Sequence, residues 1–166
     1  MLKQVQHDGE RLAKARLLAL LLPAALLAGA LGSQYLGGLY PCEMCHWQRW
    51  PHYAALALAL LAILLRNSPA SHILTLLAGL AILASGAIGV FHAGVEYGWW
   101  EGLTRCSAGA SGGSSQDILA EIMATPVIRC DEVQWSLLGI SLAGWNAIFS
   151  LGGGSAILLL CLKPSR

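Results

Sequence analysis

Two cysteines in the first third of the chain, Cys42 and Cys45, form a Cys-x-x-Cys pair. Such a pair can close and reopen as a disulfide, and the short spacing commonly lowers the pKa of a thiol. Because His46 follows directly, the same residues also spell the attachment site of c-type haem. Both interpretations predict redox chemistry outside the cytosol.

Arg49 follows Cys45 by four positions, which is one helical turn if a helix has begun there. A cation at this distance favours the thiolate form of a cysteine. The alternative is an arginine that extends to a membrane interface. Trp47, Trp50 and Tyr53 add flat aromatic surface, which suits interfacial anchoring or a planar lipid-soluble ligand such as a quinone.

Two further cysteines, Cys106 and Cys130, lie far apart in the second half of the chain. They lack the second Cys-x-x-Cys that makes a zinc ribbon specific, so we predict no metal site. The fifth cysteine, Cys161, lies in an apolar stretch and is expected to be a small buried side chain.

The composition places these cysteines in a membrane protein. Of 166 residues, 56% are hydrophobic and 11% are charged, which is too apolar for an ordinary soluble domain. The net charge of +1 argues against a nucleic-acid partner. Four apolar stretches, about 17–36, 47–65, 73–95 and 137–162, are each near the ~20 residues that cross a bilayer. We predict an all-α membrane protein, one domain over residues 1–166, built as a four-transmembrane-helix bundle.

Two details of the apolar stretches bear on this bundle. Glycines in the third and fourth stretches allow close helix packing, and they are Gly79, Gly86, Gly89, Gly139 and Gly144. The first stretch follows basic residues and ends in Ala28-Gly29-Ala30, so a cleaved signal peptide is its alternative interpretation. Cleavage would leave three spans.

The charges predict the orientation. Seven of the ten Lys and Arg residues lie before position 17, in the 66–71 turn or after position 162. The positive-inside rule therefore places both termini in the cytoplasm, and the loops 37–46 and 96–136 outside. Cys42, Cys45, Cys106 and Cys130 all fall in these outer loops, on the oxidising side. Two pairs there favour a relay of thiol–disulfide exchange. Two static disulfides in a non-enzymatic protein are the alternative.

The long second outer loop has its own pattern. A Gly- and Ser-rich stretch at 109–115 precedes residues 115–126, where apolar residues recur on one helical face and Pro126 ends the run. We predict a short amphipathic helix here, which either lies on the outer membrane surface or packs on the loop.

Together these residues resemble the DsbB family of membrane disulfide bond formation proteins. The resemblance covers nearly the whole chain and includes the four spans, both cysteine pairs with Arg49, and the run Cys130-Asp131-Glu132-Val133-Gln134-Trp135 before the fourth span. It implies a multi-pass enzyme of the bacterial inner membrane with periplasmic cysteine loops. Such an enzyme reoxidises a periplasmic DsbA-like, thioredoxin-fold thiol oxidase and passes the electrons to a membrane quinone, either ubiquinone or menaquinone.

The resemblance also implies a path through the four cysteines. The partner's dithiol would attack Cys106, and Cys130 would be released. Cys130 would then exchange with Cys42, which frees Cys45 as a thiolate facing the quinone. The haem interpretation of Cys42 and Cys45 leaves the second pair without a task.

Two further residues acquire roles in the same way. Arg49 would stabilise the Cys45 thiolate and the quinone oxygen as charge develops. His92 looks like the family's histidine close to the quinone, so both residues are predicted to bind the cofactor. Glu96 lies one turn after His92, where it either orients the ring or faces water.

Overall fold

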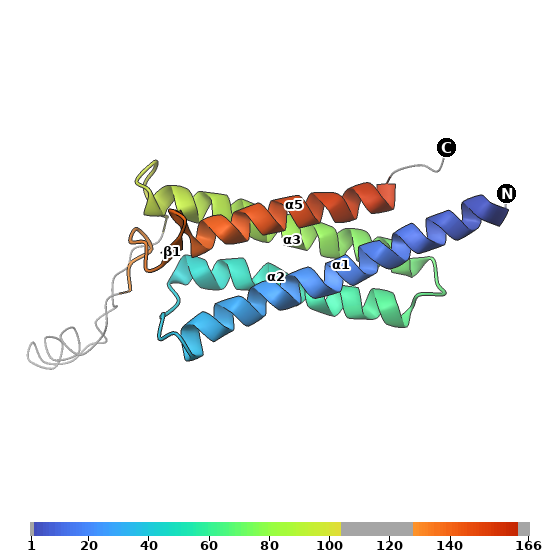
Figure 1. Ribbon diagram of the computed structural model, residues 1–166, viewed down its shortest axis with the longest axis horizontal. Coiled ribbons are helices and arrows are strands. Elements are labelled where there is room, and N and C mark those ends of the chain that lie inside the picture. Colours follow the sequence, from blue (N-terminus) through green and yellow to red (C-terminus); the bar gives the residue numbers. More distant parts are fainter. Residues whose placement is uncertain (1, 104–127, 163–166) are drawn as a thin grey trace, which may run out of the picture.

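The computed structural model describes residues 2–103 and 128–162, and in these it shows four long helices and a small β-hairpin (Figure 1). The elements are α1 (Leu2–Tyr35), α2 (Glu43–Leu64), α3 (Ala70–Glu96), β1 (Ser136–Leu137), β2 (Ile140–Ser141) and α5 (Leu142–Leu162). Successive helices run antiparallel, so the start of α1, the α2–α3 turn and the end of α5 share one end. The predicted helix at 115–126 lies outside the described residues.

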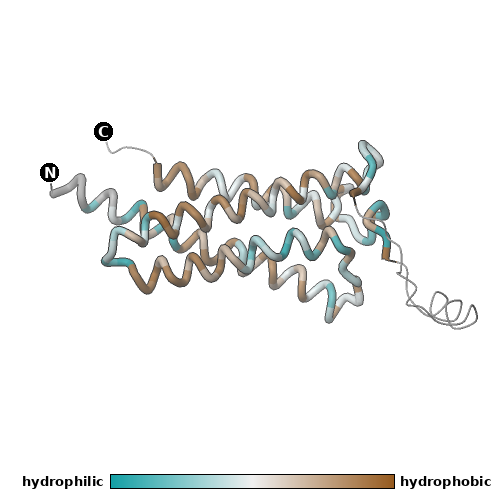
Figure 2. The backbone as a smooth tube through the Cα atoms, turned by 180° about the vertical axis from the view of Figure 1, so that it is seen from behind, coloured by the Kyte–Doolittle hydropathy of each residue, from teal (hydrophilic) through white to brown (hydrophobic). Residues whose placement is uncertain are grey.

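Three helices are long and apolar enough to cross a membrane, over Gly9–Tyr35, Ala70–Glu96 and Leu142–Leu162. Figure 2 shows hydrophobic residues along the middle of the bundle and hydrophilic residues gathered toward its ends. The 22 residues of α2 give a length of about 33 Å at 1.5 Å per residue, but its first turns carry Gln48, Arg49 and His52. An all-helical membrane protein is confirmed, whereas the count of four spans stays a prediction.

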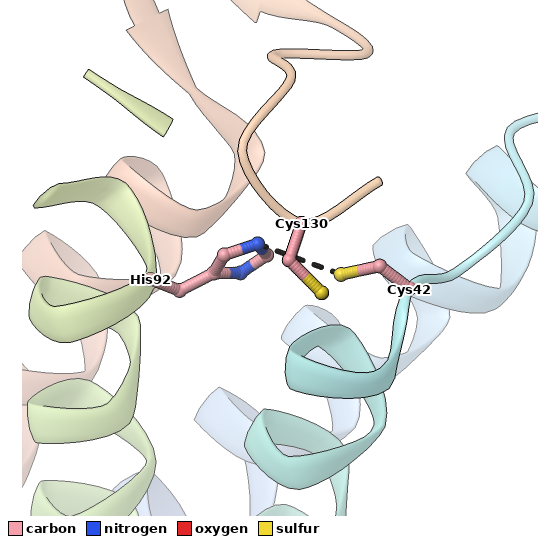
Figure 3. Close-up of side chains that lie close together, drawn as sticks. All are labelled: Cys42, His92 and Cys130. Carbon is pink, nitrogen blue, oxygen red and sulfur yellow. Dashed lines mark hydrogen bonds between the residues drawn. The ribbon is translucent and has the colours of Figure 1, made fainter. Parts of the chain in front are cut away.

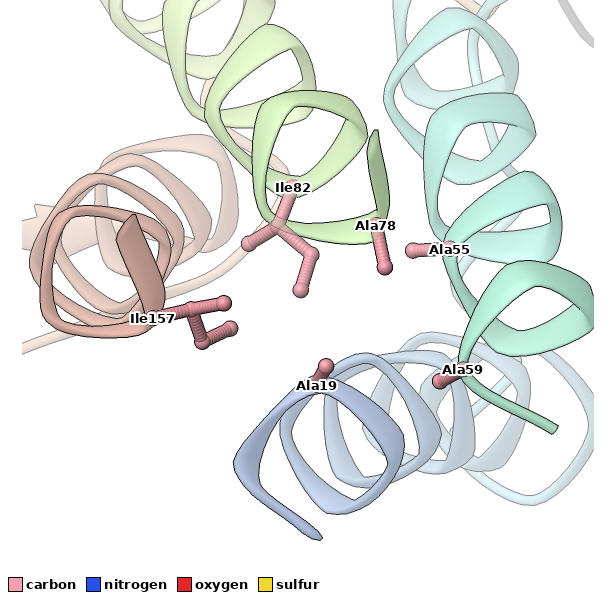
Figure 4. Close-up of a cluster of buried hydrophobic side chains, with 6 residues drawn as sticks. All are labelled: Ala19, Ala55, Ala59, Ala78, Ile82 and Ile157. Carbon is pink, nitrogen blue, oxygen red and sulfur yellow. The ribbon is translucent and has the colours of Figure 1, made fainter. Parts of the chain in front are cut away.

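The helices pack around a core of small side chains. α2 packs on α1 and α3, and both of these also pack on α5, so the four helices close a bundle. Figure 4 shows the buried cluster at its centre, which consists of Ala19, Ala55, Ala59, Ala78, Ile82 and Ile157. Alanine at the helix contacts allows the backbones to approach closely, as in membrane bundles generally.

Glycines allow α3 and α5 to approach each other closely. A Cβ atom on Gly89 would lie 3.0 Å from the Ala143 carbonyl oxygen and 3.1 Å from the Ala147 nitrogen. A Cβ on Gly86 would lie 2.9 Å from Leu151 Cγ. Gly139 differs from the expectation, because it lies in the hairpin turn rather than in a helix contact.

The first helix starts well before the apolar stretch that predicted it. Its polar first half stays helical and lies beside the end of α5, where the Arg11 guanidinium donates to the carbonyl oxygens of Leu159 and Leu160, at 3.3 and 3.2 Å. These carbonyls belong to the last turn of α5, where carbonyl oxygens have no N–H partner within the helix. A cation at a helix carboxyl end is also favoured by the helix dipole.

The fourth apolar stretch begins with a hairpin, so α5 starts at Leu142 instead of 137. Leu137 pairs with Ile140, and the two turn residues have φ of 53° at Leu138 and 76° at Gly139. Two positive φ values are typical of a type I′ turn. Tyr97 anchors the hairpin at the end of α3, because its hydroxyl donates to the Gly139 carbonyl and accepts from the Ser141 N–H. The chain before the hairpin is thereby held across this end of the bundle.

Candidate active site

The Cys-x-x-Cys pair lies at the amino-terminal end of α2. Cys42 is the N-cap residue, and its Sγ accepts a hydrogen bond from the Cys45 N–H at 3.3 Å. The Cys42 thiol also donates to Cys45 Sγ, with the two sulfurs 2.9 Å apart. This hydrogen bond and burial raise the pKa of the Cys42 thiol well above its usual range. When the reduced pair loses one proton, the remaining proton therefore stays on Cys42 and the charge lies on Cys45.

Cys130, which is distant in the sequence, lies beside this pair. It lies on the segment held by the hairpin, and its Sγ, Cys42 Sγ and a ring nitrogen of His92 are all within 4.8 Å of one another (Figure 3). All three side chains are buried, and Met44 and Val95 pack against the two sulfurs. Two thiols and an imidazole are ligand types that zinc accepts, but they also place two sulfurs within reach of exchange.

A chain of amide hydrogen bonds holds the His92 ring. Gln48 Nε2 lies 2.7 Å from His92 Nδ1, and His92 Nε2 lies 3.5 Å from Cys42 Sγ. Asn146 of α5 donates from Nδ2 to Gln48 Oε1 at 2.8 Å. Glu96 Oε1 is 3.8 Å from His92 Nε2, so this carboxyl faces the ring instead of water. The histidine is therefore fixed by three helices.

Beside the cysteines, a cavity of about 200 Å³ lies between α1, α2 and α5. Cys45 and Arg49 lie on its wall, and Trp145 and Phe149 stack on each other at the α5 side with ring centroids 5.5 Å apart. The remaining lining residues are Ala25, Leu26, Leu27, Gly29, Ala30, Ser33, Gln48, His52, Leu142, Ala143 and Asn146. The cavity is therefore mostly apolar, with one sulfur and one cation on its wall.

Arg49 is buried against α1 and does not extend to solvent, with only 8% of its surface exposed. Its guanidinium donates to Gln34 Oε1 at 2.5 Å and to the Ala30 carbonyl oxygen at 3.0 Å. No carboxylate pairs with it among the described residues. A buried cation with only neutral acceptors is suited to an anion that forms in the cavity.

The predicted site residues thus fall in two adjoining places. Cys42, Cys130 and His92 meet at the helix ends, and Cys45 connects this cluster with Arg49 and the cavity. His92 contacts the sulfurs and is not among the described residues that line the cavity. Cys106 lies outside the described residues.

The structure also places the aromatic residues, His46 and Cys161. The aromatic residues Trp47, Trp50 and Tyr53 do not line the cavity, where Trp145 and Phe149 supply the rings instead. His46 is exposed on α2. Cys161 is partly buried and packs against the alanine cluster, in keeping with an apolar role.

Three residues of the site were missed in the sequence, namely Gln48, His52 and Asn146. The first two follow Cys45 at helical spacing, so they share its face of α2. Asn146 is an amide in a mostly apolar helix, where a polar side chain is expected to face a neighbouring helix or a cavity. His52 Nε2 lies 2.9 Å from Asn146 Oδ1, and its buried Nδ1 has no hydrogen-bond partner among the described residues.

Comparison with known proteins agrees with this geometry. The family model of the disulfide bond formation protein DsbB matches residues 12–160. Proteins named disulfide bond formation protein B are 36% identical in Verminephrobacter eiseniae, over 89% of this chain and 84% of the relative, and 34% identical in Methylococcus capsulatus, over 90% and 94%. The Marinobacter nauticus protein of that name is 33% identical over 80% and 81%. No solved structure matches the chain. With its membrane helices and its clustered cysteines, the chain belongs to the DsbB family of disulfide bond formation proteins.

Proposed function

We propose that this protein reoxidises a periplasmic DsbA-like thiol oxidase and passes the two electrons to a membrane quinone. The observation that carries the proposal is the position of three sulfurs. Cys130 Sγ lies beside Cys42 Sγ, Cys42 Sγ lies 2.9 Å from Cys45 Sγ, and Cys45 lies on the wall of a largely apolar cavity with Arg49. Electrons can therefore pass from Cys130 to Cys42, then to Cys45 and the cavity, by successive thiol–disulfide exchange.

The first half of the cycle transfers the partner's electrons to the inner pair. A partner thiolate attacks Cys106 of a Cys106–Cys130 disulfide, and Cys130 leaves as a thiolate. The partner's second thiol then resolves the mixed disulfide and frees Cys106. Cys130 attacks Cys42, so that a Cys42–Cys130 bond forms while the Cys42–Cys45 bond breaks and Cys45 leaves as a thiolate.

The second half restores both disulfides. Cys106 attacks Cys130, which closes the outer disulfide and releases Cys42. The Cys42–Cys45 dithiol is then oxidised again, and a bound quinone supplies the acceptor for two electrons and two protons. Arg49 stabilises negative charge on Cys45 and on a ligand oxygen in the cavity. The net reaction converts reduced partner and quinone to oxidised partner and quinol.

The proposal includes a place in the cell, namely the bacterial inner membrane with the cysteine end in the periplasm. The loops 36–42 and 97–103 and the hairpin share one end of the bundle, and Cys130 lies beside Cys42 there. The opposite end holds the basic start of α1 and the turn with Arg66. This distribution supports the orientation given by the positive-inside rule.

The test uses the purified full chain with a reduced DsbA-like thioredoxin-fold protein and a soluble quinone. We expect quinone reduction, measured by the change in quinone absorbance. This activity should be lost in Cys45→Ser and in Cys130→Ser and kept in Cys161→Ala. Two results would favour static disulfides instead. One is quinone reduction that does not depend on both cysteine pairs, and the other is no quinone reduction by the unaltered protein.

The c-type haem interpretation has a separate check. Cys42 is buried and 3.5 Å from His92, so a macrocycle attached to it would have to displace the packed segment around Cys130. We therefore expect no Soret band in the purified protein.

A further inference from the structure

Backbone carbonyls fix which way two amides point, the buried Gln48 and the partly buried Asn146. Asn146 directs Nδ2 at the Ser85 carbonyl oxygen, at 3.3 Å, and Gln48 directs Nε2 at the Met44 carbonyl oxygen, also at 3.3 Å. A carbonyl oxygen only accepts hydrogen bonds, so each of these atoms must be the NH₂ end of its amide. Asn146 Oδ1 is occupied separately, because the Ser150 hydroxyl donates to it at 3.0 Å.

This orientation determines what His92 receives. Asn146 donates to Gln48 Oε1, and Gln48 in turn presents an N–H to His92 Nδ1 at 2.7 Å. A ring nitrogen that accepts a hydrogen bond carries no proton, so the proton of the neutral ring lies on Nε2. Nε2 is the nitrogen that faces Cys42 Sγ at 3.5 Å and Glu96 Oε1 at 3.8 Å.

We propose that Gln48 and Asn146 are positioning residues, which keep the His92 proton on Nε2 so that this N–H faces the sulfurs of Cys42 and Cys130 during exchange. The role in exchange rests on the proposed function, whereas the position of the proton does not. As Cys130 attacks, the Cys42–Cys130 bond forms, the Cys42–Cys45 bond breaks, and the negative charge moves from Cys130 to Cys45 with no net gain of electrons. An N–H donor stabilises that charge on sulfur in a buried site.

The opposite tautomer would act against the reaction. If Nδ1 carried the proton, the Nε2 lone pair would face the attacking thiolate and repel it. Glu96 faces the ring from the same helix with Oε1 3.8 Å from Nε2, which is beyond hydrogen-bond distance, and the backbone of Cys130 also forms a hydrogen bond with the ring. Gln48 and Asn146 hold the ring from α2 and α5, so the donor stays within reach of the sulfurs.

The first test measures the ring proton directly. In the full chain labelled with ¹⁵N-histidine in detergent micelles, the ¹⁵N chemical shifts of His92 should show a protonated Nε2 and an unprotonated Nδ1. Gln48→Met, of similar volume, should give a mixture of both tautomers. A wild-type ring with its proton on Nδ1 would overturn the proposal.

The second test measures exchange without quinone. A reduced DsbA-like protein is mixed with the oxidised chain, the reaction is quenched with acid, and the Cys42–Cys130 disulfide is quantified by mass spectrometry. Loss of one hydrogen bond should slow its formation about tenfold in Gln48→Met and in Asn146→Leu.

Thr75→Val is the matched control for the kinetics. Thr75 is fully buried on the same helix as His92, and its hydroxyl donates to the Ser71 carbonyl at 2.7 Å, far from the cysteines. We expect its exchange rate to equal that of the wild type. A Gln48→Met protein that exchanges at the wild-type rate overturns the inference alone. A wild-type protein that neither exchanges nor reduces quinone overturns the proposed function, and the NMR result still decides the tautomer.

Discussion

The two sulfurs of the Cys-x-x-Cys pair have different surroundings. Cys42 is only 4% exposed and lies among Met44, Val95 and Cys130, whereas Cys45 lies on the cavity wall. The shared hydrogen bond keeps the proton on Cys42. One sulfur thus faces the incoming thiolate, and the other faces the position from which electrons leave the protein.

This asymmetry predicts the alkylation pattern of the reduced protein. With iodoacetamide, Cys45 should react several times faster than Cys42, as measured by mass spectrometry of the peptides. Raising the pH from about 7 to 9 should not activate Cys42, because its raised pKa leaves the thiol protonated across this window. In Cys45→Ser the thiol loses its sulfur partner, so labelling of Cys42 should increase with pH. Equal labelling of both cysteines in the wild type would contradict the assignment.

The position of Arg49 predicts that its loss affects quinone reduction more than the partner's attack on Cys106–Cys130. Arg49→Ala should raise the KM for quinone by about 10- to 100-fold, as expected for losing a hydrogen bond from a charged group worth about 1.5–3 kcal/mol. The partner's attack on the Cys106–Cys130 disulfide, which releases Cys130, should stay within about twofold, because Arg49 contacts α1 and the cavity but not Cys130. Arg66→Ala, an exposed arginine in the turn at the opposite end, is the control. Equal loss of quinone reduction and of the partner's attack on Cys106–Cys130 would exclude this role.

Among the elements, α3 and α5 meet at the site. Both helices carry part of the histidine network, His92 on α3 and Asn146 on α5, and Gly89 of α3, three residues before His92, lies against Asn146. A Cβ on Gly89 would lie 3.1 Å from Asn146 Nδ2, so the close approach also sets where that amide lies. Small residues here therefore serve both packing and geometry.

We expect Gly89→Val to destabilise the protein by about 1–3 kcal/mol, the usual cost of overpacking, because the α5 backbone would have to move. The free energy of unfolding can be measured by denaturant titration in mixed micelles. Gly152→Ala is the matched control, since no atom lies within 4 Å of a Cβ there. An unchanged stability in Gly89→Val would show that α5 can move away freely.

The hairpin has a similar role at the other side of the site. Its turn places Leu138 at a positive φ, which is uncommon for a residue other than glycine, and Tyr97 holds the turn at Gly139 and the second strand at Ser141. The hairpin directs residues 128–135 back across the helix ends. Cys130 reaches Cys42 for this reason, although the two residues are far apart in the sequence.

For the whole molecule, the orientation in the membrane can be tested by labelling. In a chain whose native cysteines are serine, Leu36→Cys should react with a membrane-impermeant maleimide added outside spheroplasts. Asn67→Cys should react only after the membrane is permeabilised, because the positive-inside rule places its turn in the cytoplasm. Both positions are exposed in the structure, so burial does not prevent their labelling. The reverse pattern would invert the proposed orientation.

Much of the helical frame follows from the sequence alone, because it depends on interactions within a few residues. Apolar length predicted the helices, and the spacing of Cys42, Cys45 and Arg49 placed these three residues around the first turns of α2. The boundaries differed where polar contacts extend an element or a turn delays it, as with Arg11 at the end of α5 and the hairpin before Leu142. Charge alone also gave the expected orientation.

The tertiary structure decided which distant side chains meet. Cys130 lies on Cys42, Ala30 and Gln34 of α1 hold Arg49, and Asn146 reaches Gln48 across the bundle. No local pattern encodes these contacts, because they depend on how closely the helices approach and on the angle between them, which the packing of small residues sets. The sequence thus determined the redox groups and the helices that carry them, whereas packing decided which sulfur faces the histidine and which faces the cavity.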